Sequence, residues 1–244
     1  MLAESRQELP PDGALPGTLQ FEQKADGFRA IVFARADLVQ VQSRQGTDLT
    51  PAFPGIAHAA AARLDQGLVL DGELVVPHEG KLDFSELQHR ARRRGRGAAE
   101  AAQQQPAYLI VFEILETAST ELVARPYRER RAILVDLFDR EVLTAPYVLC
   151  PATADRATAL EWLDPVWGAA GIEGVVVKGS EQRYAMGKRG WLKVRARTTA
   201  EAVIGGVTGA AASPSTLLLA RYDASWRLRS SASRRPRRCA RPRR

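Results

Sequence analysis

Apolar and polar positions alternate, or apolar β-branched residues cluster, in seven stretches of this chain, and that pattern predicts strands. The expected strands cover residues 28–34, 38–43, 67–76, 107–115, 146–150, 173–178 and 191–195. Helix-like stretches lie near residues 54–65, 83–92, 126–140 and 155–170. Because strands and helices are mixed without a regular strand–helix–strand rhythm, the pattern favours an α+β fold over a doubly wound parallel sheet.

The ends of two of these elements carry further signals. Asp155 is a candidate N-cap for the helix near residues 155–170, and Gly171 is a candidate for its end. Residues 90–97 are rich in arginine and glycine and are followed by an Ala/Gln stretch. We expect that region to be a helix end that runs into an exposed loop.

The character of the chain changes after Arg197. Residues 199–207 and 215–223 are β-like and are joined by glycine- and alanine-rich turns, as at the start of a small β domain. From about Trp226 the sequence consists mainly of Arg, Ser, Pro and Ala without periodicity. About 30 residues are too few for an independent β-barrel. The expected division is a main domain at 1–197, an incomplete second domain at 198–228 and a disordered arginine-rich tail at 229–244.

Composition narrows the class of protein. With 45% hydrophobic residues in 244, the chain has ample material for a core. No apolar run approaches the ~20 residues of a membrane span, and the first residues lack a signal-peptide pattern. Cys150 and Cys239 are too few and too far apart to indicate a disulfide framework or a zinc site, and the three histidines form no ligand-spaced pair. We expect a soluble protein of a reducing compartment.

The net charge of +7 is concentrated at one end of the chain. Residues 227–244 contain nine arginines and no acid, which leaves a net charge of −2 on residues 1–226. The sequence pI of about 9.8 is therefore poor evidence for a nucleic-acid-binding face on the main domain.

The strongest chemical signal is the octapeptide Glu-Gln-Lys-Ala-Asp-Gly-Phe-Arg at residues 22–29. Its lysine, Lys24, is one of five in a chain with 30 arginines. A lysine amine attacks phosphorus only when neutral, a state favoured by desolvation or cationic neighbours, whereas arginine stays protonated. Asp26-Gly27 predicts a tight turn that leaves Lys24 at a strand end facing a cleft. The alternative is a hairpin whose lysine is merely solvated.

Five further segments with polar or aromatic residues follow Lys24 along the chain. They are Ser43-Arg44-Gln45-Gly46, Asp71-Gly72-Glu73, Phe112-Glu113, Glu173 to Lys178, and Trp191 to Arg195. Period two places Lys193 and Arg195 on one face of their strand, and Glu173 and Lys178 on opposite sides of a valine run. Each segment alone also has an ordinary explanation, such as a surface bend, a core aromatic or an amphipathic edge strand.

Taken in order, the segments K-x-D-G-x-R, S-R-x-G, D-G-E, F-E, E-G-V-V-V-K and W-L-K-V-R resemble the motif series of covalent nucleotidyltransferases. The likeness is greatest to the bacterial ATP-dependent DNA ligases and covers roughly residues 1–228. The resemblance implies an α+β, ATP-grasp-like adenylation domain with two antiparallel β-sheets flanked by helices, followed by an OB fold that is incomplete here. Glu113 departs from the family's usual aspartate, and Met186 from its usual proline.

The resemblance also implies a role for each motif residue. Lys24 would attack the α-phosphate of ATP, form a lysyl-AMP phosphoramidate and release pyrophosphate. Lys178 and Lys193 would lie near that phosphate and favour a neutral Lys24. Glu73 and Glu173 would place Mg²⁺ or Mn²⁺.

The remaining roles concern the nucleotide and the nick. Phe112 would stack on adenine, and Glu22 lies where the family reads the base edge. Arg29 and Arg44 match positions that hold ribose or phosphate, including the 5′-phosphate of a nick, and Glu73 would also contact ribose. The residues expected to bind the nucleotide are Glu22, Arg29, Arg44, Glu73, Phe112, Lys178 and Lys193.

The function implied is sealing of 5′-phosphate/3′-hydroxyl nicks by an ATP-dependent DNA ligase. One alternative is an RNA ligase or a capping-type guanylyltransferase, which differs in its nucleotide and acceptor. Another is an inactive remnant that binds ATP or DNA. Because the last, basic motif of the OB fold is missing, self-adenylation is expected to be weak. Expected partners are nicked double-stranded DNA and other DNA-repair proteins, with no membrane, for a monomer in the bacterial cytoplasm that associates with the nucleoid.

Overall fold

The computed structural model describes residues 1–63, 65, 67–118, 120–196, 202–210, 212–223 and 225–234, without the side chains of residues 230–234. The chain divides into two compact units, Met1–Arg197 and Thr198–Arg244. No helix within the described ranges is long and apolar enough to cross a membrane.

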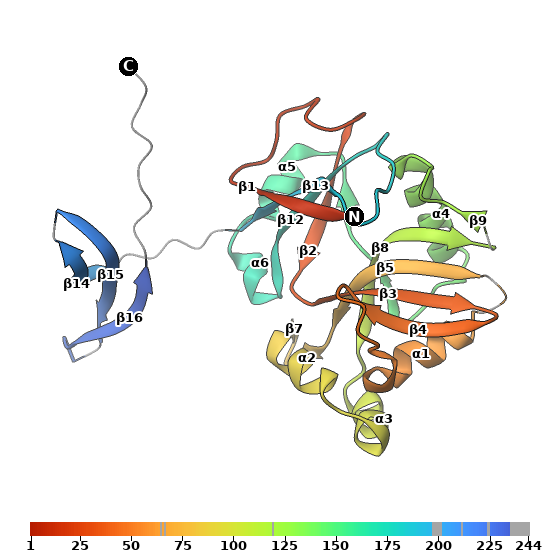
Figure 1. Cartoon of the computed structure of the whole chain (residues 1–244), viewed down its shortest axis with the longest axis horizontal. Coiled ribbons are helices and arrows are strands. Elements are labelled where there is room, and N and C mark those ends of the chain that lie inside the picture. Colours follow the sequence, from red (N-terminus) through yellow and green to blue (C-terminus); the bar gives the residue numbers. More distant parts are fainter. Residues whose placement is uncertain are drawn as a thin grey trace. The chain divides into compact units, whose positions relative to one another are not determined.

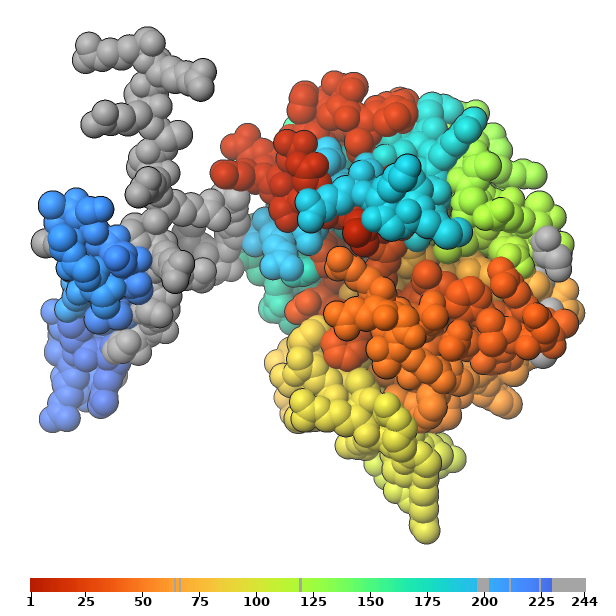
Figure 2. All heavy atoms as spheres, in the orientation of Figure 1, coloured from red at the N-terminus to blue at the C-terminus, as the bar shows by residue number. Residues whose placement is uncertain are grey.

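One sheet of the first unit has five strands in the order β1-β13-β12-β2-β11 (Figure 1). The strands are β1 (Leu2–Arg6), β13 (Arg189–Arg195), β12 (Ile172–Gly179), β2 (Leu19–Ala25) and β11 (Ala152–Thr153). Neighbours are antiparallel except β1, which runs parallel to β13. The N-terminal residues, red in Figure 2, therefore lie beside the cyan segment that contains β13.

The second sheet has the order β10-β8-β5-β3-β4, with β9 paired to β8. The strands are β10 (Tyr147–Leu149), β8 (Tyr108–Thr117), β5 (Leu68–Val75), β3 (Phe28–Arg35), β4 (Leu38–Ser43) and β9 (Thr120–Glu121). Only β10 is parallel to its neighbour, because it follows β8 through a helical crossover, the connection that parallel pairing requires. The expected α+β fold with two antiparallel sheets is confirmed, apart from the parallel edge strands β1 and β10.

The helices are α1 (Pro54–Ala61), α2 (Phe84–Ala91), α3 (Gly95–Gln104), α4 (Tyr127–Asp139), α5 (Arg156–Glu161) and α6 (Val166–Ala169), with a 3₁₀ turn at Thr50–Ala52 and a short β6–β7 ladder, Pro77–His78 with Lys81–Leu82. Each helix packs against one of these sheets, except α3, which packs against α1. One core joins Ile56 of α1 and Leu134 of α4 to the second sheet. A smaller cluster contains Val69 of β5 and Trp191 of β13, so apolar side chains also join the two sheets directly.

Two helix predictions need correction. The stretch after residue 94, expected as a loop, forms α3, because alanine is the strongest helix former and Ala98 and Ala101 are buried along one side. The helix expected at residues 155–170 is two short helices, α5 and α6, because a proline at 165 cannot continue a helix. The Asp155 cap is confirmed, since its carboxylate accepts hydrogen bonds from the backbone N–H groups of Ala157 and Thr158.

The second unit contains an antiparallel sheet in the order β14-β15-β16. Its strands are β14 (Val203–Ala210), β15 (Ser213–Tyr222) and β16 (Leu228–Arg234). The expected disorder from residue 229 is wrong for residues 229–234, because the free edge of β15 offers backbone donors and acceptors that β16 pairs with. The rest of that expected tail, residues 235–244, lies outside the described residues.

Candidate active site

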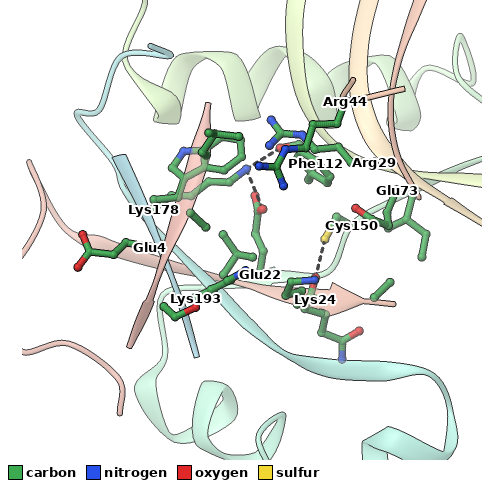
Figure 3. Close-up of a pocket in the computed structure, with 18 of the residues that line it drawn as sticks. Glu4, Glu22, Lys24, Arg29, Arg44, Glu73, Phe112, Cys150, Lys178 and Lys193 are labelled. Carbon is green, nitrogen blue, oxygen red and sulfur yellow. Dashed lines mark hydrogen bonds and ion pairs between the residues drawn. The ribbon is translucent and has the colours of Figure 1, made fainter. Parts of the chain in front are cut away.

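A cavity of about 560 Å³ brings together residues of both sheets of the first unit. The first sheet contributes side chains from β1, β2, β12 and β13, and the second contributes residues of β3, β5 and β8 and Arg44 beyond β4. Figure 3 shows these side chains around the cavity. Eight residues predicted from sequence line it: Glu22, Lys24, Arg29, Arg44, Glu73, Phe112, Lys178 and Lys193.

Strand register places the first-sheet residues on one face. Val176 of β12 lies between Glu22 of β2 and Lys193 of β13, and two residues earlier Gly174 lies between Lys24 and Arg195. Residues two apart on a strand share a face, so these side chains form two adjacent cross-strand rows. The period-two prediction for Lys193 and Arg195 agrees with this register.

Glu173, the ninth predicted residue, reaches Lys24 through a β-bulge. The β2–β12 register shifts between Ile172 and Gly174, so Glu173 is an extra residue opposite β2. Its carboxylate forms an ion pair with the Lys24 ammonium and another with Arg195, at 3.3 Å. Strict alternation along β12 would place Glu173 on the face opposite to Lys178. The bulge instead lets the Glu173 carboxylate reach Lys24, which lines the cavity.

Gly174 makes this close packing possible. Its φ is +148°, and a Cβ atom there would lie 2.1 Å from the Val194 carbonyl oxygen. Only glycine fits such a position without displacing the neighbouring strand.

The turn after Lys24 connects the two sheets. β2 belongs to the first sheet and β3 to the second, so the hairpin alternative for Lys24 is wrong. A Cβ atom on Gly27 would lie 2.3 Å from the Leu74 carbonyl oxygen, which explains why glycine follows Asp26. The crossing sets Lys24 and Arg29 on different sheets that line the same cavity.

Arg29 is held rigidly in the cavity wall. Its Nε and Nη2 atoms donate to the two carboxylate oxygens of Asp71 at 2.9 and 2.6 Å, and the Tyr184 hydroxyl donates to Asp71 at 2.8 Å. The guanidinium also lies 5.5 Å from the ring centre of Phe112 and 5.2 Å from that of Trp191. Such a fixed, planar cation suits recognition of a phosphate or a ribose hydroxyl.

Glu73 and Lys193 have perturbed titration. Burial raises the pKa of Glu73 from 4.5 to about 7, and the charges of Lys24 and Arg29 oppose that rise. Burial, together with the charges of Lys24 and Arg195, lowers the pKa of the Lys193 amine. The cavity therefore disfavours isolated charges of both signs, as expected for a site that places charged groups together out of water.

Lys178 is fully buried and faces two acids instead of Lys24. Its ammonium lies 2.8 Å from Glu22 and donates to the Phe112 carbonyl at 2.9 Å (Figure 3). It also lies 4.4 Å from the ring centre of Trp191. A second bulge, at Phe112, lets that ring line the cavity while the next residue, Glu113, approaches Lys178 to 3.5 Å.

Sequence reasoning gave no role to Asp71, Tyr127 or Arg130. Tyr127 donates to Glu22 at 2.6 Å, and Arg130 binds Glu113 through two hydrogen bonds. A signal for Arg130 exists in the sequence: with Tyr127, Leu134 and Leu137 it follows the three-to-four spacing of the side that α4 buries. A charged residue on such a stripe needs a buried partner.

The carboxylates present fit a magnesium ion that is completed by substrate. Glu73 and Glu173 both interact electrostatically with Lys24. Asp26 lies near them, since burial and the charge of Glu173 together raise the pKa of Asp26. Over the described ranges, no group of three or more His, Cys, Asp or Glu forms a metal cage. Mg²⁺ commonly uses one or two carboxylates together with water and substrate phosphates, so this set is sufficient.

Comparison with known proteins shows the family of this chain. The model of the ATP dependent DNA ligase domain family matches residues 1–195. DNA ligase C2 of Mycolicibacterium smegmatis is 35% identical over 226 residues, which are 91% of this chain and 61% of that protein. DNA ligase C of Mycobacterium tuberculosis is 35% identical over 208 residues, 84% of this chain and 56% of that protein. The chain thus spans about three-fifths of the length of these relatives.

Solved structures show the same likeness. A mycobacterial DNA ligase D complexed with ATP and MES superposes with a TM-score of 0.61 at 27% identity, over 95% of this chain and 71% of that one. Because the superposition covers 95% of this chain, it includes most of the unit that contains the cavity. The chain belongs to the ATP-dependent DNA ligase domain family.

Proposed function

We propose that this chain carries out the adenylation chemistry of a DNA ligase at the cavity around Lys24. The lone pair of Lys24 Nζ forms a bond to the α-phosphorus of ATP while the bond to the pyrophosphate oxygen breaks. The amine loses a proton, and AMP remains on the lysine. AMP then passes to the 5′-phosphate of a nick, and the 3′-hydroxyl displaces it to form the phosphodiester.

The convergence of the motif residues on one cavity carries this proposal. Residues from Glu22 to Lys193, scattered over both sheets, line a space of about 560 Å³, within the range of small-molecule sites. Lys24 has a carboxylate, Glu173, as its ion-pair partner. Glu173 would also hold a divalent ion that neutralises the triphosphate, and the charge of Lys24 helps burial to lower the pKa of Lys193, so the two amines lie close together.

We assign the base to the end of the cavity near Phe112 and Glu22. Phe112 offers a ring for stacking on adenine, and it packs edge-on against Trp191 at 5.9 Å. One Glu22 oxygen accepts a hydrogen bond from the Tyr127 hydroxyl and the other forms an ion pair with Lys178, so both oxygens of Glu22 serve as acceptors. An acceptor at the base edge favours the amino group of adenine over the carbonyl of guanine.

We assign Mg²⁺ or Mn²⁺ to Glu73 and Glu173. A divalent ion supplies charge neutralisation for the phosphates when it is bound. Glu73 and Glu173 would hold the ion, and Lys178, Lys193 and Arg29 would orient the phosphates and ribose of ATP.

The proposed acceptor is nicked double-stranded DNA, with Arg44 at the cavity mouth for the 5′-phosphate. Arg44 is exposed and forms no ion pair with any described residue. A relative from Mycobacterium tuberculosis, 33% identical over 189 residues, is named as a multifunctional non-homologous end joining DNA repair protein, which supports a role in repair. Partner proteins, a monomeric state and a nucleoid location stay predictions. We also propose that 1–197 is the adenylation domain and that the second unit is part of an OB fold.

The test is incubation with α-labelled nucleotide and Mg²⁺, followed by denaturing electrophoresis. We expect label from ATP to stay on the chain and label from GTP not to. The adenylated protein should then join a nicked DNA duplex faster than a nicked RNA duplex. Labelling by GTP alone would favour a capping-type enzyme, preference for RNA would favour an RNA ligase, and no label at all would favour an inactive relative.

A further inference from the structure

Lys178 lies in a buried group of four charges. The exposed fraction is 0% for the Lys178 side chain, 2% for Glu22 and 1% for both Glu113 and Arg130. Two cations and two anions balance in number, and each acid touches Lys178. Charges buried this deeply are strongly coupled, so removing one changes the partners of the others.

Helix α4 supplies a second partner for each of the two acids. Tyr127 and Arg130 are three residues apart and so lie on the same side of the helix. Tyr127 donates its hydroxyl to Glu22 at 2.6 Å. Arg130 donates from Nε and Nη2 to the two oxygens of Glu113 at 2.9 and 2.8 Å.

The two acids hold Lys178 unequally. The Lys178 ammonium is 2.8 Å from Glu22 and 2.9 Å from the Phe112 carbonyl oxygen, but 3.5 Å from Glu113. An ammonium has three N–H groups, and only two of them make short contacts here. The bidentate Arg130 pair satisfies both oxygens of Glu113, so Lys178 makes only a long hydrogen bond, 3.5 Å, to that acid.

Arg130 is itself fixed by more than Glu113. It donates to the Gln182 carbonyl at 3.1 Å and to the Arg125 carbonyl. Its guanidinium also lies within 6.0 Å of the ring centres of Tyr127 and Tyr184. These contacts hold the Arg130 side chain in place outside the cavity, whereas Lys178 lines it.

We propose that Arg130 is a positioning residue for nucleotidyl transfer. Because Arg130 donates to both oxygens of Glu113, that acid does not draw Lys178 into a short ion pair. One N–H of Lys178 then stays available to bind the α-phosphate. This inference rests on the proposed function of the cavity, and it adds a residue of α4 that acts on the reaction only through Glu113 and Lys178.

The first variant to test is Arg130→Met, which keeps the length of the side chain and removes its charge. Glu113 is then buried without its partner, and Lys178, 3.5 Å away, is the nearest cation to take its place. At saturating ATP, the single-turnover rate of lysyl-AMP formation by the whole chain should fall about 10- to 100-fold, the loss expected when a phosphate donor is misdirected. The ATP concentration for half-maximal rate should change by less than about threefold, because transition-state contacts are lost more than ground-state ones.

The second variant is Arg130→Met combined with Glu113→Gln. It removes both members of the buried pair, so no uncompensated charge remains to capture Lys178. The rate should return to within about fivefold of the wild-type rate. Arg128→Gln is the matched control, since Arg128 lies on the same helix but is exposed and paired with Glu181 outside the cavity; its rate should equal the wild-type rate.

Circular dichroism of each variant establishes that it is folded under assay conditions. A folded Arg130→Met protein with the wild-type rate would overturn the inference, as would a double variant that stays as slow as Arg130→Met. If Arg130→Met does not fold, the double variant decides alone: a rate near wild type supports the inference, and a slow folded protein refutes it. A wild-type chain that forms no lysyl-AMP would instead refute the proposed function.

Discussion

Lys24, which lines the cavity between the two sheets, forms an ion pair with Glu173, 149 positions away in the sequence. The pair depends on the bulge that makes Glu173 an extra residue opposite β2. It places an acid next to the proposed nucleophile at the point where a divalent ion would enter with ATP. We therefore expect Glu173 to be required for the metal-dependent formation of lysyl-AMP.

We expect Glu173→Ala to reduce formation of lysyl-AMP by at least about 100-fold, because a carboxylate that offsets the ion against the phosphates is lost. Wild-type labelling should vanish in EDTA and return with Mg²⁺ or Mn²⁺. Rates are measured with α-labelled ATP over a range of Mg²⁺ concentrations. Undiminished labelling in EDTA would rule out the metal assignment.

Glu73 should make stability depend on pH. Its pKa is about 7 in the folded chain, mainly because of burial, against 4.5 for an ordinary glutamate. The folded state thus holds a proton that the unfolded state has lost, and the unfolding free energy falls as pH rises from about 4.5 through 7. Glu73→Gln has no carboxyl group at this position and so lacks this pH-dependent loss. The unfolding free energy of Glu73→Gln minus that of wild type should therefore increase between about pH 5 and pH 8, by at most about 3 kcal/mol.

Urea unfolding of both proteins at the two pH values measures this difference. Other titrating groups are common to the two proteins and largely cancel. A difference in stability that is the same at both pH values would contradict the assignment of the shift to Glu73.

Gly174→Ala should disrupt the sheet that carries Lys24. The added Cβ would lie 2.1 Å from the Val194 carbonyl oxygen, where backbone must move, and φ is +148°. We expect a destabilisation of about 1–3 kcal/mol or more, with loss of labelling. The matched control is Gly97→Ala in α3, whose Cβ would meet nothing within 4 Å; it should stabilise the chain by about 0.5–1 kcal/mol. Thermal unfolding of both variants tests the contrast, and equal effects would show that the close approach is unimportant.

Arg44→Ala should separate the two halves of the reaction. Arg44 is exposed at the cavity and, among the described residues, makes no ion pair that its loss would break. Lysyl-AMP formation should change little, whereas sealing of a nick by the adenylated protein should slow about 10-fold or more and become less sensitive to salt. Gel assays of each step at two salt concentrations measure this. A loss confined to lysyl-AMP formation would place Arg44 on ATP instead of DNA.

The resemblance to the ligase motif series predicted most of the site residues, and local patterns supported a few of them. Period two set Lys193 and Arg195 on one strand face, and the scarcity of lysine drew attention to Lys24 and Lys178. Irregularities in the strands were not foreseeable in the same way: the bulges at Glu173 and Phe112 change which face a side chain reaches, and both depend on pairing with distant strands. Helix α3 was missed because its glycines outweighed the alanines whose burial stabilises it.

Arg130 shows a different limit. Its position on the buried stripe of α4 is visible in the sequence, but its partner, Glu113, lies on another element and is brought to it only by the fold. Charge pairs between distant elements therefore need the structure, even where each member looks unusual by itself.

Mapping the adenylated residue is the sharpest test of Lys24 as the nucleophile. The chain is incubated with ATP and Mg²⁺ and digested, and the peptide that carries AMP is identified by mass spectrometry. We expect AMP on Lys24 alone and no adduct in Lys24→Arg, because arginine has no free amine at neutral pH. Lys81→Arg, which changes a control lysine exposed on β7, should form a normal adduct. AMP that persists in Lys24→Arg, or that maps to another lysine, would contradict this assignment.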